Sequence, residues 1–266
     1  MKVQPLNHTD LDLLPDLQPD GWQDITPSFD FYTKSSFCFP VKIITDDKIV
    51  GIGTTIIHHE VAWLAHIIVH KDHRKKGIGL LITETLVDSL KSKNCETIYL
   101  LATELGAPVY ERAGFETETE YLFFKDIKIG EDLQTSVKIE PYRHEFKEQI
   151  AGIDKINSGE DRMFHLEDHL QNGFVYCEDK IIKGFYLPGF GDGLIIANDS
   201  SAGLELLKLH LESNEKLVFP EENLVATNYL YEKGFKEILT GKRMRSGKKR
   251  VVNLENIYNR IGGNLG

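Results

Sequence analysis

Residues 74–80 read Arg74-Lys75-Lys76-Gly77-Ile78-Gly79-Leu80. They follow an apolar run at 64–69 that predicts a buried strand, and they lead into an amphipathic segment that predicts a helix from about Ile78. Glycines in such a turn let backbone N–H groups approach a ligand closely, and the helix N-terminus adds partial positive charge. A strand, a basic turn and a helix start therefore predict an anion site that suits a diphosphate.

The glycine spacing separates this turn from two other phosphate-binding patterns. Arg-x-x-Gly-x-Gly is neither the Gly-x-Gly-x-x-Gly of dinucleotide-binding folds nor the phosphate loop that ends in Gly-Lys-Ser or Gly-Lys-Thr. Surface turns that bind nothing also contain glycine and lysine, so the turn alone admits a second interpretation as a solvated connection.

A second segment reads Ala107-Pro108-Val109-Tyr110-Glu111-Arg112-Ala113-Gly114-Phe115. It follows a predicted strand at 97–101 and the turn 102–106. Pro108 fits the first turn of a helix, and Gly114 fits its C-terminal end. Tyr110 lies within this helix, either as an aromatic side chain that packs the helix on a sheet or as a residue with a chemical role.

In this order and at this separation, the two segments resemble the GNAT superfamily of N-acetyltransferases. The family has a coenzyme A diphosphate loop and a similar Ala-x-x-Tyr-x-x-x-Gly-Phe segment. The resemblance implies that the diphosphate is held by Arg74, Lys75, Lys76, Gly77, Ile78, Gly79 and Leu80. It implies that the backbone of Ile67, Ile68 and Val69, on a strand splayed from its neighbour, binds the pantetheine and the thioester carbonyl. Tyr110 would then lie near the sulfur and protonate the departing thiolate.

The general base is the weakest part of the resemblance. Many GNAT enzymes use a glutamate on this strand, but counting back from Gly77 places Trp63 at that position. His66, within the strand, and Glu60, at its start, are the nearby candidates. An imidazole titrates near neutral pH, which favours His66 as a catalytic residue, although a histidine on a sheet face also often serves only in packing.

Five histidines, His58, His59, His66, His70 and His73, invite a metal-site interpretation. Side chains four residues apart converge on a helix but not on a strand, where these residues are expected. We therefore predict no metal.

The local patterns alternate between strands and helices along the first half of the chain. Strands are expected at 2–6, 37–45, 48–58, 61–70, 97–101 and 119–125, and helices at 10–17, from 78 and at 107–113, with a loop at 18–30. A polar stretch at 126–136 predicts a linker, after which a similar order restarts. The expected fold class is α/β (α+β), with two tandem GNAT-like repeats that are each a mixed, mostly antiparallel sheet flanked by helices. Residues 1–130 would form the catalytic repeat and 131–266 a degenerate one that is structural or binds the acceptor.

The second repeat lacks the features that suit coenzyme A. At the position of the basic turn, residues 197–203 carry no cation and include Asp199, which would repel a diphosphate. Aligning Gly234 with Gly114 puts Leu230, not Tyr231, at the position of Tyr110. The arrangement resembles tandem GNAT proteins with a YitH/HolE-like C-terminal domain through Ala102-Thr103-x-x-Gly106, Glu160-Asp161-Arg162, Ile195-Ile196-Ala197 and Arg243-Met244-x-x-Gly247. The basic stretch 242–250 is expected to be a solvated hairpin turn.

Composition excludes some classes of protein. The 266 residues are 41% apolar, enough for a sizeable core, and 31 basic against 41 acidic residues give a net charge of −10, which argues against a nucleic-acid partner. Cys38, Cys95 and Cys177 have no metal-ligand spacing and are expected to be reduced. Without a signal peptide, lipidation motif or long apolar span, the chain is expected to be cytoplasmic and to have no membrane partner.

The predicted function is acetyl-CoA-dependent transfer of an acetyl group to a primary amine of a small molecule or peptide. The amine would attack directly in a ternary complex, with acetyl-CoA as co-substrate and the protein a monomer or homodimer. Two alternatives stay open: a non-catalytic acyl-CoA-binding module whose second repeat docks a metabolite or protein, and a protein-lysine or N-terminal acetyltransferase with an open groove.

Overall fold

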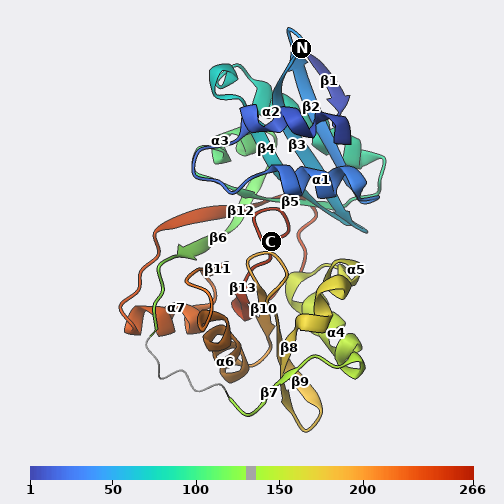
Figure 1. The fold of residues 1–266 in the computed structure, drawn as a ribbon. Helices are drawn as coiled ribbons and strands as arrows, with labels where there is room; N and C mark the ends of the chain where they lie inside the picture. The colour runs from blue at the N-terminus through green and yellow to red at the C-terminus, as the bar shows by residue number, and fades with distance from the viewer. Residues whose placement is uncertain (130–135) are drawn as a thin grey trace. The chain divides into compact units, whose positions relative to one another are not determined.

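The computed structural model describes residues 1–129 and 136–266, and it divides into two compact units (Figure 1). Unit 1 comprises Met1–Thr117, Met244–Lys249 and Gly263–Leu265, and unit 2 comprises Glu118–Arg243, Arg250–Gly262 and Gly266. The linker expected at 126–136 includes 130–135, which lie outside the described residues.

Unit 1 is a mixed sheet covered by helices on both faces. Its elements are β1 (Lys2–Pro5), the 3₁₀ helix η1 (His8–Leu17), α1 (Thr26–Lys34), β2 (Cys38–Thr45), β3 (Lys48–His58), β4 (Val61–Val69), the 3₁₀ helix η2 (Lys71–His73), α2 (Ile78–Lys91), β5 (Thr97–Ala102) and α3 (Ala107–Arg112). The strand order is β1-β2-β3-β4-β5, followed by the part of β12 (Leu239–Gly247) that belongs to this unit. β4 and β5 run parallel, whereas β1–β2, β2–β3 and β3–β4 are antiparallel. The expected mixed, mostly antiparallel sheet is confirmed.

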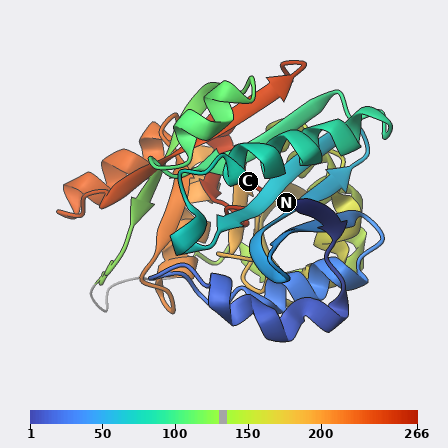
Figure 2. The same cartoon turned by 90° about the horizontal axis from the view of Figure 1, so that it is seen from above.

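Helix α2 lies directly on β3, on the face of the sheet opposite η1 and α1 (Figure 2). Gly51 and Gly53 make this approach possible, because a Cβ atom at these positions would lie 2.9 and 2.7 Å from side-chain carbons of Ile82. The buried Ile78, Ile82 and Leu86 of α2 form a core cluster with residues of β2, β4 and β5.

Gly53→Ala should therefore destabilise the protein by about 1–3 kcal/mol, because the added methyl group overpacks the α2–β3 contact. The free energy of unfolding from urea titration measures this change. Gly152→Ala, in the interior of α4 (Lys147–Ser158), is the matched control, since no atom lies within 4 Å of its Cβ position. It should stabilise the helix by about 0.5–1 kcal/mol. Equal unfolding free energies for the two variants would show that α2 does not pack this closely.

Unit 2 contains a second sheet and its own helices. Its elements are β6 (Glu116–Phe124, from Glu118), β7 (Ile139–Pro141), η3 (His144–Phe146), α4, α5 (Met163–Leu166), η4 (Glu167–Asn172), β8 (Phe174–Glu178), β9 (Ile181–Leu187), β10 (Leu194–Ala197), α6 (Ser200–Leu211), β11 (Leu217–Pro220), α7 (Leu224–Glu232), β12 up to Arg243, η5 (Leu254–Asn256) and β13 (Ile257–Asn259). One sheet has the order β13-β10-β9-β8-β7, and β11 pairs antiparallel with β6. The order β8-β9-β10-α6-β11-α7-β12 repeats the earlier order β2-β3-β4-α2-β5-α3-β6.

Three local predictions are wrong, each for a physical reason. The helix expected at 10–17 is the 3₁₀ helix His8–Leu17, which begins after Asn7, whose backbone N–H donates to Asp10. The loop expected at 18–30 ends earlier, because α1 begins at Thr26 with Pro27 in its first turn, a position that tolerates proline. The expected hairpin at 242–250 is instead the end of β12, and Arg243 is buried at 2% exposure with its Nε 3.4 Å from a carboxylate oxygen of Glu118.

Among the described residues, none of the helices combines the length and apolar character needed to span a bilayer. The three cysteines are free thiols.

Candidate active site

A bulge in β4 sets the direction of His66. The pairing with β3 jumps from Thr54–Ala65 to Ile52–Ile68, and His66 in this gap has a positive φ of 49°. A bulge re-aims the side chains next to it, and a non-glycine residue in the left-handed region costs about 1–3 kcal/mol. Ile67 accordingly packs against the α2 cluster, whereas the ring of His66 lies against the rings of α1.

β4 and β5 separate after three residue pairs. The ladder joins Val61, Ala62 and Trp63 to residues 97–99, and beyond Trp63 no pairing with β5 exists among the described residues. Along the stretch of β4 that holds Ile67, Ile68 and Val69, one edge of the strand faces β3. The other edge is not paired with β5. An edge of this kind presents backbone N–H and C=O groups to a ligand.

The turn after β4 leads directly into the N-terminus of α2. Lys75 and Gly77 have positive φ values of 60° and 80°, and α2 begins directly after Gly77. The N–H of Leu81 makes the bond to the carbonyl of Gly77 at 3.0 Å, so the N–H groups of Ile78, Gly79 and Leu80 precede the helical ladder. A Cβ on Gly77 would meet nothing within 4 Å, so the space beside this helix N-terminus is open. An open helix N-terminus of this kind suits an anion.

The cationic side chains of the turn bond to nearby backbone. Arg74 Nε donates to the carbonyl of Val69 at 3.3 Å, and Lys76 Nζ donates to the carbonyl of Asp72 at 2.9 Å. Their charges stay close to the turn, but the groups aligned with the α2 axis are the backbone amides. The backbone therefore carries the specific geometry and the side chains add charge.

Tyr110 lies on α3 beside the same place. A Cβ on Gly79 would lie 3.8 Å from both Val69 and Val109, so the end of β4, the start of α2 and α3 meet there. A Cβ on Gly106 would lie 3.0 Å from Cε2 of Tyr110, so the phenol ring packs closely against this glycine. Burial raises the pKa of Tyr110 to about 12, so the phenol keeps its proton at neutral pH and can donate it.

His66 belongs to a hydrogen-bonded chain that the sequence did not predict. Its Nδ1 lies 2.9 Å from the hydroxyl of Tyr32, and Nδ2 of Asn264 donates to that hydroxyl at 2.9 Å. Trp22 contacts the His66 ring edge-on at a centroid distance of 6.2 Å. Burial lowers the pKa of His66 to about 4, so the imidazole is neutral at pH 7. Asn264 lies 198 positions from His66 in the sequence, and no local pattern connects the two.

The other candidate bases are placed less favourably. Trp63 is fully buried and packs on Tyr99 at a centroid distance of 5.3 Å, so the position used by glutamate in the resembling family is a core position here. Glu60 lies in the turn between β3 and β4, at the far end of β4 from Val69. Within residues 1–129 and 136–266, no three His, Cys, Asp or Glu side chains are grouped to hold a metal ion.

Comparison with known proteins agrees with this geometry. Residues 6–115 match the acetyltransferase (GNAT) family model. This segment is similar to the GNAT acetyltransferases. It holds the bulged strand, the turn and α3, so each residue predicted for the coenzyme lies inside the matched GNAT segment.

Individual relatives extend the comparison. The [ribosomal protein bS18]-alanine N-acetyltransferase of Salmonella typhimurium is 28% identical over 82 residues, which cover 30% of this chain and 55% of the relative. This chain thus spans about half the length of that curated relative. A crystal structure of a putative acetyltransferase from Pyrococcus horikoshii has a TM-score of 0.83 at 19% identity. The match covers 100% of this chain and 95% of the Pyrococcus chain. A tandem GNAT protein from the clavulanic acid biosynthesis pathway has a TM-score of 0.58 at 10% identity. The match covers 92% of this chain and 98% of that protein. Both structures share the GNAT fold with this chain.

Unit 2 has a different helix start where the GNAT segment has its turn. Asp199 is the N-cap of α6, and its Oδ1 accepts from the N–H of Ala202 at 3.0 Å. A carboxylate already occupies this helix N-terminus. Leu230 is fully buried in the core of unit 2, and the neighbouring Tyr231 donates to Glu237 at 2.8 Å. Neither position offers a phenol equivalent to Tyr110.

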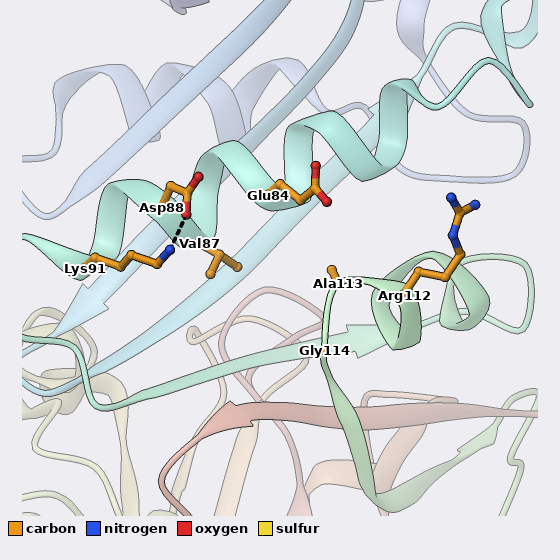
Figure 3. Close-up of a pocket in the computed structure, with 7 residues that line it drawn as sticks. All are labelled: Glu84, Val87, Asp88, Lys91, Arg112, Ala113 and Gly114. Carbon is orange, nitrogen blue, oxygen red and sulfur yellow. Dashed lines mark ion pairs between the residues drawn. The ribbon is translucent and has the colours of Figure 1, made fainter.

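A surface hollow in unit 1 lies between α2 and α3 (Figure 3). It is lined by Glu84, Val87, Asp88, Lys91, Arg112, Ala113 and Gly114. Asp88 and Lys91 form an ion pair at 2.6 Å along α2, and Arg112 reaches across from α3 (Figure 3). None of the predicted site residues lines this hollow, so we assign it no part in GNAT chemistry.

Proposed function

We propose that this chain is an acetyl-CoA-dependent N-acetyltransferase whose active site lies in unit 1. The observation that carries the proposal is the meeting of three elements around Gly79: the unpaired edge of β4, the open N-terminus of α2, and α3 with Tyr110. A thioester aligned on β4 with its diphosphate at α2 would bring its sulfur toward α3.

The residues take the following parts in the proposed reaction. The N–H groups of Ile78, Gly79 and Leu80 bind the diphosphate, with charge from Arg74, Lys75 and Lys76, and the backbone of Ile67, Ile68 and Val69 binds the pantetheine and thioester carbonyl. The neutral amine nitrogen attacks the thioester carbon, the carbon–sulfur bond breaks, and the departing thiolate takes the proton of Tyr110. The acylated nitrogen loses its extra proton to solvent water, and water returns a proton to the Tyr110 phenolate. No covalent enzyme intermediate forms. His66 contacts the acceptor side of the site as the second catalytic residue.

The acceptor is a primary amine of a small molecule or a peptide. The Salmonella relative is named for an alanine of a ribosomal protein, which supports an amine acceptor and leaves both sizes of acceptor in the proposal. We further propose that residues 1–130 are a catalytic repeat and 131–266 a degenerate repeat of the YitH/HolE type, in a cytoplasmic monomer or homodimer. The Asp199 cap supports the absence of a second coenzyme site.

A non-catalytic acyl-CoA-binding module is the second candidate, and the buried Trp63 at the usual glutamate position favours it. Release of free coenzyme A thiol from acetyl-CoA, measured against a panel of amines, amino acids and peptides, separates the two candidates. We expect amine-dependent release with at least one acceptor. Tight acetyl-CoA binding with no thiol release for any of the acceptors would contradict the enzyme proposal and support the non-catalytic binding module.

A further inference from the structure

The chain from Asn264 through Tyr32 to His66 has a direction that hydrogen-bond chemistry determines. An amide nitrogen only donates, so Nδ2 of Asn264 donates to the phenol oxygen of Tyr32 at 2.9 Å. Burial raises the pKa of the phenol, and the hydrogen bond from Asn264 acts against this increase. This bond uses one lone pair of the phenol oxygen, and the phenol proton still needs an acceptor.

The phenol proton has one remaining acceptor in this network. Nδ1 of His66 lies 2.9 Å from the phenol oxygen. If Nδ1 carried a proton, the phenol oxygen would accept from both Asn264 and His66, and the phenol proton would have no acceptor among these residues. The arrangement that satisfies every group has the Tyr32 O–H donating to a bare Nδ1.

A neutral imidazole with a bare Nδ1 carries its proton on Nε2. No hydrogen-bond partner of Nε2 exists among the described residues, so this N–H is available to a ligand. The rings of Trp22, Phe29 and Tyr32 surround the imidazole at centroid distances of 6.2, 5.8 and 5.6 Å. These apolar walls fix the ring, and the left-handed backbone at the β4 bulge holds it away from the α2 side.

We propose that His66 presents Nε2–H as a hydrogen-bond donor to an oxygen of the acceptor substrate, and that Tyr32 and Asn264 are positioning residues that hold this tautomer. The substrate class is then an amine that carries a carbonyl, carboxylate or hydroxyl oxygen near its reactive nitrogen. His66 does not remove the amine proton in this arrangement. The substrate part of this inference rests on the proposed acetyltransferase function, whereas the tautomer does not.

Asn264→Asp tests the direction of these hydrogen bonds, because the two side chains have nearly the same shape. A carboxylate only accepts, so it would take the Tyr32 proton, and Nδ1–H of His66 would then donate to the phenol oxygen. Long-range proton–nitrogen correlation spectra of the labelled full chain show which ring nitrogen carries hydrogen, and His66→Gln identifies the His66 signals. We expect Nε2–H in the native chain and Nδ1–H in Asn264→Asp. Asn94→Asp, at an exposed turn of unit 1, is the control for added charge and should keep Nε2–H.

The double variant Tyr32→Phe/Asn264→Asp removes the link between the two residues and should keep Nε2–H. Nδ1–H in the native chain, or Nε2–H unchanged in Asn264→Asp with the fold intact by thermal unfolding, would overturn the inference.

In the enzyme assay, Asn264→Asp should raise the acceptor KM about tenfold and leave the acetyl-CoA KM unchanged, as expected for loss of one hydrogen bond. Failure of acetyl transfer with the expected tautomers would refute the proposed function and its substrate class, and leave the tautomer assignment standing.

Discussion

Tyr110→Phe should lower kcat by about 100-fold or more while the acetyl-CoA Kd stays nearly constant, because only the proton donated to the leaving thiolate is lost. The ring remains to pack α3, since phenylalanine keeps all of the contacts that Tyr110 makes through carbon. Steady-state thiol release gives kcat, and calorimetry gives the Kd.

The high pKa of Tyr110, about 12, makes the phenol a proton donor across the neutral range, so the loss in kcat should be similar from pH 7 to pH 9. Tyr231→Phe is the matched control, because this half-exposed phenol donates to Glu237 in unit 2 and has no proposed role. It should leave kcat unchanged. Native turnover in Tyr110→Phe would remove the phenol from the chemistry and leave Tyr110 as a packing residue.

Gly77→Glu should weaken acetyl-CoA binding by about 100-fold or more, because a carboxylate beside the N-terminus of α2 competes with and repels the diphosphate. The open space around Gly77 admits the side chain without a clash, so the effect falls on the ligand site. Isothermal calorimetry with acetyl-CoA measures the change.

Two controls separate charge from backbone strain. Gly77→Gln has nearly the same shape without the charge and should bind more tightly than Gly77→Glu. Gly234→Glu reproduces the strain, because Gly234 has a φ of 86° and open space like Gly77, but it lies in unit 2, where no diphosphate site is proposed. It should bind acetyl-CoA normally. Normal affinity in Gly77→Glu would contradict the assignment of the turn.

The elements around the proposed coenzyme site could be predicted because their signals are local. The apolar run of β4, the glycines of the turn and the helical periodicity of α2 lie within about 30 residues and agree with one another. The same holds for α3, where Pro108 and Gly114 mark the first turn and the end. These segments fold in the same way in their tertiary context as their own residues indicate.

The features that the sequence did not predict depend on contacts between distant residues. The bulge that turns His66 toward α1 follows from the register of β4 on β3, and this register depends on pairing between two strands rather than on the residues of β4 alone. Asn264 reaches Tyr32 only because Gly263–Leu265 belong to unit 1. The basic residues of β12 suggested a solvated turn, but Arg243 is buried with a carboxylate, which a charge pattern alone does not reveal.

A crystal structure with bound acetyl-CoA tests the central claim most directly, that the turn after β4 holds the diphosphate and α3 supplies the proton donor. We expect diphosphate oxygens within hydrogen-bond distance of the N–H groups of Ile78, Gly79 and Leu80, and the Tyr110 hydroxyl beside the thioester sulfur. A coenzyme bound elsewhere with this turn empty, or a Tyr110 hydroxyl out of reach of the sulfur, would contradict it.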